Sequence, residues 1–195
     1  MAYLRSILSK DYYNRISSIG FTLAIMELMY GVVVRPECGE GLLKWLVMTG
    51  AMPTEEAMAE CREAIKNGDY DTCKCVHQKE SCVFRILDVY YNVFKTILPL
   101  NLALSLFAGF RNGHLPIADA VRSTAFSASC VTAYQVILCL HGYLVRHNLD
   151  PLPRHRYIYA VFGALASLTI FLEKAERRPE IALFVRNICV LLILV

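Results

Sequence analysis

The feature that most restricts the fold of this chain is a stretch of 23 residues, Ser123 to Val145, that contains no Asp, Glu, Lys or Arg. A helix needs roughly 20 predominantly apolar residues to cross the hydrocarbon core of a bilayer, so this stretch is long enough to span a membrane. The composition agrees, because 56% of the 195 residues are apolar and only 19% are charged, whereas soluble domains have about 25% charged residues. The sequence therefore predicts an all-α, polytopic helical membrane protein.

Four further segments are weaker candidates for membrane spans. They are Ile16–Val34, Ile86–Phe110, Tyr157–Leu172 and Ile181–Val195. Three of them contain charged residues, and a charge at the centre of a span costs roughly 2.5–3.5 kcal/mol on insertion scales, so such a charge must lie against protein or water. Glu27 and Arg186 are two of these charges, and we expect them to pair across helices. The sequence predicts four to five spans in total.

The polar residues divide the chain into three parts. Residues 1–34 form an N-terminal flank and first span, residues 35–85 an extramembrane linker, and residues 86–195 a membrane bundle with spans at about 86–110, 123–145, 157–172 and 181–195. Within the linker, Thr54 to Ile65 has the pattern of an amphipathic helix, with Thr54 as N-cap and acidic residues in the first turn. The Lys and Arg counts on the two sides are similar, so the positive-inside rule does not give an orientation.

Small residues at helical spacing predict how two of the spans pack. Lipid tails are as apolar as leucine, so helices in membranes associate through small residues that let their backbones approach. We predict an antiparallel hairpin of residues 123–145 and 157–172, separated by a proline-containing turn, whose helix-packing residues are Ala125, Ser129, Ala133, Gly163 and Ser167.

A polar face is predicted in the span at 86–110. Asp88, Asn92 and Lys95 are four and three residues apart, so they share one face of a helix. Ionisable groups inside a membrane usually line a cavity or pair with one another. The alternative is that the helix begins at the membrane interface and the true span starts near Lys95.

A cysteine- and histidine-containing motif closes the linker. Cys73, Cys75, His77 and Cys82 offer three thiols and an imidazole within ten residues, which is enough for a tetrahedral zinc site. The spacing is not that of a zinc finger, so a disulfide and a loop of reduced thiols remain alternatives. We predict no resident cofactor, with zinc as the exception to test. The chain has no Gly-x-Ser-x-Gly, His-Glu-x-x-His or phosphate-binding glycine loop, and we predict that it is not an enzyme.

Several stretches resemble the transmembrane protein 135 family. The run from Phe171 to Phe184 resembles the family's acidic-basic turn, with Glu173, Arg177 and Arg178 as its marked positions. The segment Cys75 to Cys82 resembles the cysteine- and histidine-containing segment that precedes each half of the family's internal repeat. Two shorter stretches also match: residues 26–50 resemble the end of a preceding half, and residues 108–113 resemble a phrase in peroxisomal membrane protein 4.

The resemblance covers most of the chain and implies a location and a role. The family is distantly related to the mitochondrial preprotein-translocase membrane subunits and to peroxisomal membrane protein 4. It continues past the point where this chain ends, so we expect a fragment or a truncated member. The resemblance implies an integral membrane protein of mitochondria or peroxisomes that acts in lipid homeostasis and organelle dynamics, without catalysis.

The sequence leaves two alternative functions open and also indicates the kind of partner. The first alternative to the role above is a transport or translocation component whose polar face lines a pathway. The second is a metal- or redox-dependent membrane enzyme that uses the Cys/His linker. The expected partners are the lipid bilayer and other membrane proteins or a second copy of the chain. A net charge of +3, scattered along the sequence, argues against a nucleic-acid partner.

Overall fold

The computed structural model describes residues 10–34, 40–77, 81–112, 117–149, 155–179, 181–183 and 185. This part of the chain is all-helical and contains no strand, which confirms the predicted fold class at that level. The elements are, in chain order, α2 (Lys10–Val34), α3 (Glu40–Met48), α4 (Glu55–Lys66), α5 (Thr72–His77), α6 (Cys82–Asn112), α7 (Ile117–Arg146), α8 (Ile158–Ser167) and the 3₁₀ helix η2 (Leu168–Leu172).

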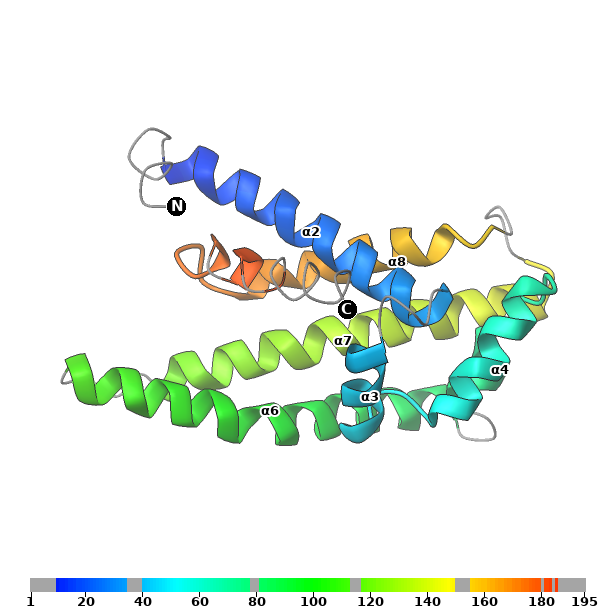
Figure 1. Cartoon of the computed structure of the whole chain (residues 1–195), viewed down its shortest axis with the longest axis horizontal. Coiled ribbons are helices and arrows are strands. Elements are labelled where there is room, and N and C mark those ends of the chain that lie inside the picture. Colours follow the sequence, from blue (N-terminus) through cyan, green and yellow to red (C-terminus); the bar gives the residue numbers. More distant parts are fainter. Residues whose placement is uncertain are drawn as a thin grey trace.

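Helix α7 lies at the centre of the molecule. It runs beside α6 along most of its length, and α2 and α8 lie together against its other side (Figure 1). Aromatic side chains join these layers, because the ring of Phe21 on α2 lies 5.8 Å from that of Phe126 on α7. The hydroxyl of Tyr134 on α7 also donates a hydrogen bond of 3.2 Å to the backbone carbonyl of Met29 on α2. The core therefore lies between α2, α7 and α8.

Two of the described helices are long and apolar enough to cross a membrane, by length and composition. They are Tyr12–Val34 within α2 and Ile117–Arg146, which is α7; Ile158–Leu172 is apolar but shorter. The predicted span at 86–110 lies within α6, which is not among these candidates. Most of the predicted span at 181–195, including Arg186, lies outside the described residues, so the expected pairing of Arg186 with Glu27 also falls outside them.

The predicted linker helix is confirmed, with its cap. Thr54 precedes α4 in an extended conformation, and its side-chain oxygen accepts a hydrogen bond of 3.2 Å from the backbone N–H of Ala57. Met58 and Cys61 of α4 and Val76 of α5 are buried in the same hydrophobic core as residues of the long helices. The linker therefore contributes to that core. On the neighbouring face of α4, Arg62 donates a hydrogen bond of 3.1 Å to the carbonyl of Val32 at the end of α2.

The prediction that Gly163 and Ser167 pack on the 123–145 span needs correction. A Cβ built on Gly163 would lie 2.9 Å from the carbonyl oxygen of Ile25 and 2.9 Å from the Cα of Met26, both on α2. The hydroxyl of Ser167 likewise donates a hydrogen bond of 2.9 Å to that of Thr22, also on α2. The small residues of α8 therefore serve its contact with α2, because the fold sets α8 against α2 more extensively than against α7.

Ala125, Ser129 and Ala133 are half-buried on α7. Helix α7 makes its most extensive contact with α6 and also contacts α8. These three residues therefore lie on a helix that packs between α6 and α8, and not in a simple two-helix hairpin with α8. The turn itself is confirmed in position, because α7 ends at Arg146 and α8 begins at Ile158.

Candidate functional site

A close contact between α5 and α7 creates the candidate site. A Cβ built on Gly142 of α7 would lie 2.8 Å from the backbone nitrogen of Cys73, closer than real Cβ atoms come to backbone atoms. The absence of a side chain at Gly142 therefore lets α5 lie directly on α7. The hydroxyl of Thr72 then donates a hydrogen bond of 3.1 Å to the carbonyl of Leu138, which lies one turn before Gly142.

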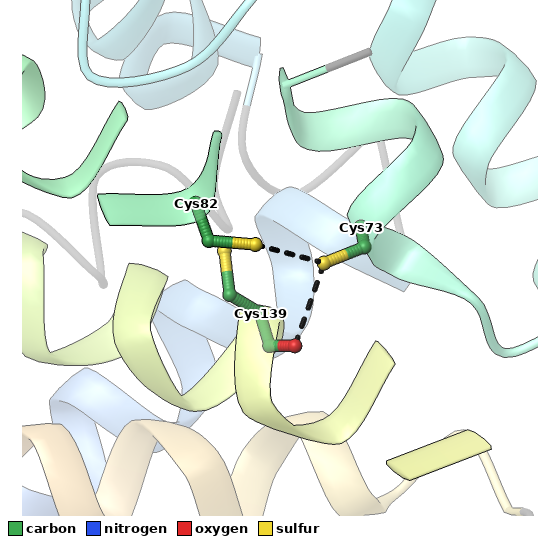
Figure 2. A group of neighbouring side chains, drawn as sticks. All are labelled: Cys73, Cys82 and Cys139. Carbon is green, nitrogen blue, oxygen red and sulfur yellow. Dashed lines mark hydrogen bonds between the residues drawn. The ribbon is translucent and has the colours of Figure 1, made fainter. Parts of the chain in front are cut away.

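Three thiols from three helices meet at this contact. Cys73 comes from α5, Cys82 is the first residue of α6, and Cys139 lies on α7 (Figure 2). The three sulfur atoms all lie within 4.8 Å of one another, and those of Cys73 and Cys82 are 3.8 Å apart. The thiol of Cys73 also donates a hydrogen bond of 3.4 Å to the backbone carbonyl of Cys139. We call Cys73, Cys82 and Cys139 the three-cysteine cluster.

The surroundings of Cys73 and Cys82 favour protonated thiols. The contact of Cys73 with the side chain of Cys139 raises the pKa of the Cys73 thiol well above its ordinary value, and burial raises it further. Burial also raises the pKa of the Cys82 thiol, as does its contact with Cys73. Since a thiolate is the nucleophilic form of cysteine, these two groups are poorly suited to nucleophilic catalysis at neutral pH.

Polar groups flank the cluster on α5 and α7. Gln135, buried one turn before Cys139, donates a hydrogen bond of 3.9 Å from its side-chain nitrogen to the sulfur of Cys139. On the other side, Arg146 holds the carboxylate of Asp71 with two hydrogen bonds of 3.0 and 3.3 Å. The side chain of Asp71 is only 4% exposed, so this pair fixes the start of α5 against the end of α7.

The structure brings together part of the predicted cysteine–histidine motif. The sulfur atoms of Cys73 and Cys82 are in contact. The side chains of Cys75 and His77 are outside the part of the chain whose side chains the structure describes. Cys139 was not predicted as a member of the site. The signal for it was present, because Gln135, Cys139 and Gly142 are four and three residues apart and thus form one small and polar face within an apolar helix.

The predicted polar face of α6 lies at an open depression of about 490 Å³, whose lining includes Asn92, Lys95 and Gly50. Gly50 follows α3 with φ +71°, and a Cβ built on it would lie 3.2 Å from the side-chain nitrogen of Asn92. Asp88 does not line the depression; it is exposed and pairs with Arg85 at 3.3 Å. Two of the three predicted residues therefore share one surface feature.

The predicted turn motif forms a buried polar clamp at the start of α7. The hydroxyl of Ser123 donates a hydrogen bond of 2.7 Å to the carboxylate of Glu173 and accepts one of 2.6 Å from Arg177. Glu173 is 2% exposed. Arg178 closes the turn by donating a hydrogen bond of 3.1 Å to the backbone carbonyl of Glu173. A second pair, Lys174 with Asp119 at 2.5 Å, lies beside it. The clamp ties the chain after η2 to α7.

No family model matches this sequence, and no curated protein or solved structure matches it significantly. The resemblance to the transmembrane protein 135 family stays a prediction.

Proposed function

We propose that this chain is a non-enzymatic integral membrane protein of mitochondria or peroxisomes, with four to five helices in the bilayer, and that it acts in lipid homeostasis and organelle dynamics. One observation carries the membrane part of the proposal. Four helices each bear a stripe of exposed large apolar side chains at helical spacing, on the side that faces away from the core. The stripes are Ile16, Ile19 and Leu23 on α2; Leu100, Leu104 and Phe107 on α6; Val136, Leu140 and Tyr143 on α7; Val161, Leu165 and Leu168 on α8 and η2.

These stripes need a partner that is itself apolar. A helix on the surface of a water-soluble protein has polar residues on its outer face, whereas a helix that is apolar all round is buried or spans a membrane. Single exposed apolar residues are normal, but larger continuous apolar surfaces mark contact with another protein or with lipid. Because the stripes lie on four helices, the hydrocarbon core of a bilayer is the partner that would cover them all.

Membrane insertion is tested with the full chain in cells. The protein should remain in the membrane pellet after alkaline carbonate extraction and enter solution only with detergent. Leu140→Arg places a charge on the α7 stripe, which costs roughly 2.5–3.5 kcal/mol at the centre of a span, and should lower insertion. The matched control Glu63→Arg changes a residue that is exposed on α4 and should have no effect. Release of the wild-type protein by carbonate would overturn the membrane proposal.

The cellular role rests on the family resemblance and needs a separate test. A tagged full chain should overlap with mitochondrial or peroxisomal markers, and its depletion should change organelle shape and neutral lipid content. Re-expression of the wild-type chain should restore both. Unchanged lipid content in depleted cells, with the protein still in the membrane, would overturn the lipid role while leaving the membrane proposal intact.

The depression at Asn92 and Lys95 favours transport or translocation as a second candidate function, because it joins polar groups of α6 to the turn after α3. Asn92→Leu together with Lys95→Met would remove those groups. A loss of transport by the double variant in vesicles, with normal insertion, would favour this candidate over the lipid role. The third expectation, a metal- or redox-dependent enzyme, has less support, because no cysteine lines the depression.

A further inference from the structure

We propose that Cys73, Cys82 and Cys139 form a binding site for one thiophilic closed-shell cation, Zn²⁺ or Cu⁺. The site does not depend on the membrane role proposed above, and it differs from the contiguous cysteine–histidine motif because its third ligand comes from α7. Its consequence is structural: the ion would join α5, α6 and α7 at a single point.

The distances match those of a thiolate-bound ion. Zinc–sulfur bonds are about 2.3 Å long, so two thiolates on a tetrahedral zinc ion lie about 3.8 Å apart. The sulfur atoms of Cys73 and Cys82 are 3.8 Å apart, and all three sulfur atoms lie within 4.8 Å. The widest pair therefore needs to close by at most about 1 Å to reach the spacing of a tetrahedral zinc site.

The donor set selects soft cations. Thiolates prefer Cu⁺ and Zn²⁺ over Mg²⁺ and Ca²⁺, which take oxygen ligands. Three thiolates satisfy a three-coordinate Cu⁺ ion, whereas Zn²⁺ needs a fourth ligand such as water. A disulfide would use only two of the three sulfur atoms and would not explain why Cys139 lies beside Cys73 and Cys82.

The groups around the three sulfur atoms resemble those that surround the ligands of protein-bound metal ions. Residues that hydrogen-bond to metal ligands hold them in place and tune their charge. Gln135 donates from its side chain to the sulfur of Cys139, and Arg146 lies beside the cluster, where it pairs with Asp71 two residues before Cys73. The N–H donor next to the sulfur of Cys139 stabilises a thiolate there. Binding of the ion would displace the thiol protons of Cys73 and Cys82, because a metal ligand must be deprotonated.

The test uses the full chain purified in detergent under anaerobic, reducing conditions. The protein is loaded in separate arms with Zn²⁺ and with Cu⁺, freed of excess ion, and measured by elemental analysis. One equivalent of bound ion in either arm is expected, and the arm that binds identifies the ion. Cys139→Ser should lower the affinity more than tenfold, and Gln135→Leu should lower it by about tenfold.

Cys130→Ser is the matched control, because Cys130 is a buried free cysteine on the same helix that lies outside the cluster. It should bind as much ion as the wild type. If Cys139→Ser fails to fold by circular dichroism, alkylation of the wild-type protein decides the matter. Bound ion should protect Cys82 from alkylation, and a chelator should reverse the protection.

Three results would overturn the proposal. The first is no bound ion in either arm. The second is equal binding by Cys139→Ser and the wild type. The third is a Cys73–Cys82 disulfide in protein whose thiols were blocked at cell lysis, because this would show that the cluster is oxidised and not metallated in the cell.

Discussion

Two glycines let helix backbones touch in this protein, Gly163 where α8 meets α2 and Gly142 where α7 meets α5. In both places a Cβ would lie within 3.0 Å of a backbone atom of the opposite helix. The surroundings differ. Around Gly163 the buried neighbours are apolar or small, such as Phe162 and Ala166, whereas Gly142 lies against Cys73 and near the carboxylate of Asp71. The α2–α8 contact is a packing contact, and the α5–α7 contact is held by polar groups.

The two contacts are stabilised by different kinds of interaction. Small residues that bring two helices together are the usual means of association in membranes, where hydrophobic burial gives little driving force between helices. The α5–α7 contact instead holds a six-residue helix through hydrogen bonds to backbone carbonyls and one ion pair. Its small area offers little packing energy, so specific polar contacts must position it.

Gly163→Leu should reduce the stability of the protein most. The new side chain cannot fit against the backbone of Ile25 and Met26, so the α2–α8 contact must open, and we expect a loss of about 3 kcal/mol in the free energy of unfolding. The measurement is thermal unfolding in detergent.

Two variants serve as controls for Gly163→Leu. Gly20→Leu adds the same side chain on α2, at a position with open space around it, and should not destabilise the protein, because leucine is a better helix former than glycine. Ser129→Leu, at a half-buried position on α7, should lie between the two. Equal stability of Gly163→Leu and the wild type would refute the close contact of α8 with α2.

Gly142→Ala should have the next largest effect. A methyl group at this position would press on the backbone of Cys73, and we expect a loss of about 1–3 kcal/mol. Since α5 is short, it should move away from α7 while the long helices stay packed. Limited proteolysis should then cut near α5 faster, while α2 remains protected. A uniform increase in cleavage along the chain would contradict the distinction between the two contacts.

Arg146→Met tests the ion pair of the α5–α7 contact. The carboxylate of Asp71 would keep its burial and lose two hydrogen bonds, which we expect to cost about 1 kcal/mol, because Arg146 is half-exposed and solvent screens the pair. The loss should shrink in high salt. Arg122→Met, an exposed arginine on the same helix, is the control. A larger effect on α2–α8 stability than on α5 protection would argue against the local role.

Gly20→Ala should give a small gain in stability. Gly20 lies within α2 with no heavy atom near the position of a Cβ, and alanine is more stable than glycine inside a helix by roughly 0.5–1 kcal/mol. Gly20→Ala should therefore raise the thermal unfolding midpoint slightly, while Gly163→Ala should lower it. If both substitutions act in the same direction, helix propensity and not close contact governs this part of the molecule.

The helical class, the position of α7 and the cap of α4 could be predicted from the sequence alone. These features depend on local properties: an apolar run of sufficient length, prolines in the turn, and a threonine before acidic residues. The sequence also marked Glu173 and Arg177 as a motif, although not that Ser123 would join them through hydrogen bonds.

Which helices meet could be learned only from how they pack in three dimensions. Small-residue spacing showed that Gly163 lies on a contact face but not that the face belongs to α2, because a pattern within one helix carries no information about its partner. For the same reason, spacing within residues 73–82 could not reveal Cys139, which lies far along the chain. That thiol reaches Cys73 and Cys82 because α7 has no side chain at Gly142 and α5 can lie against its backbone.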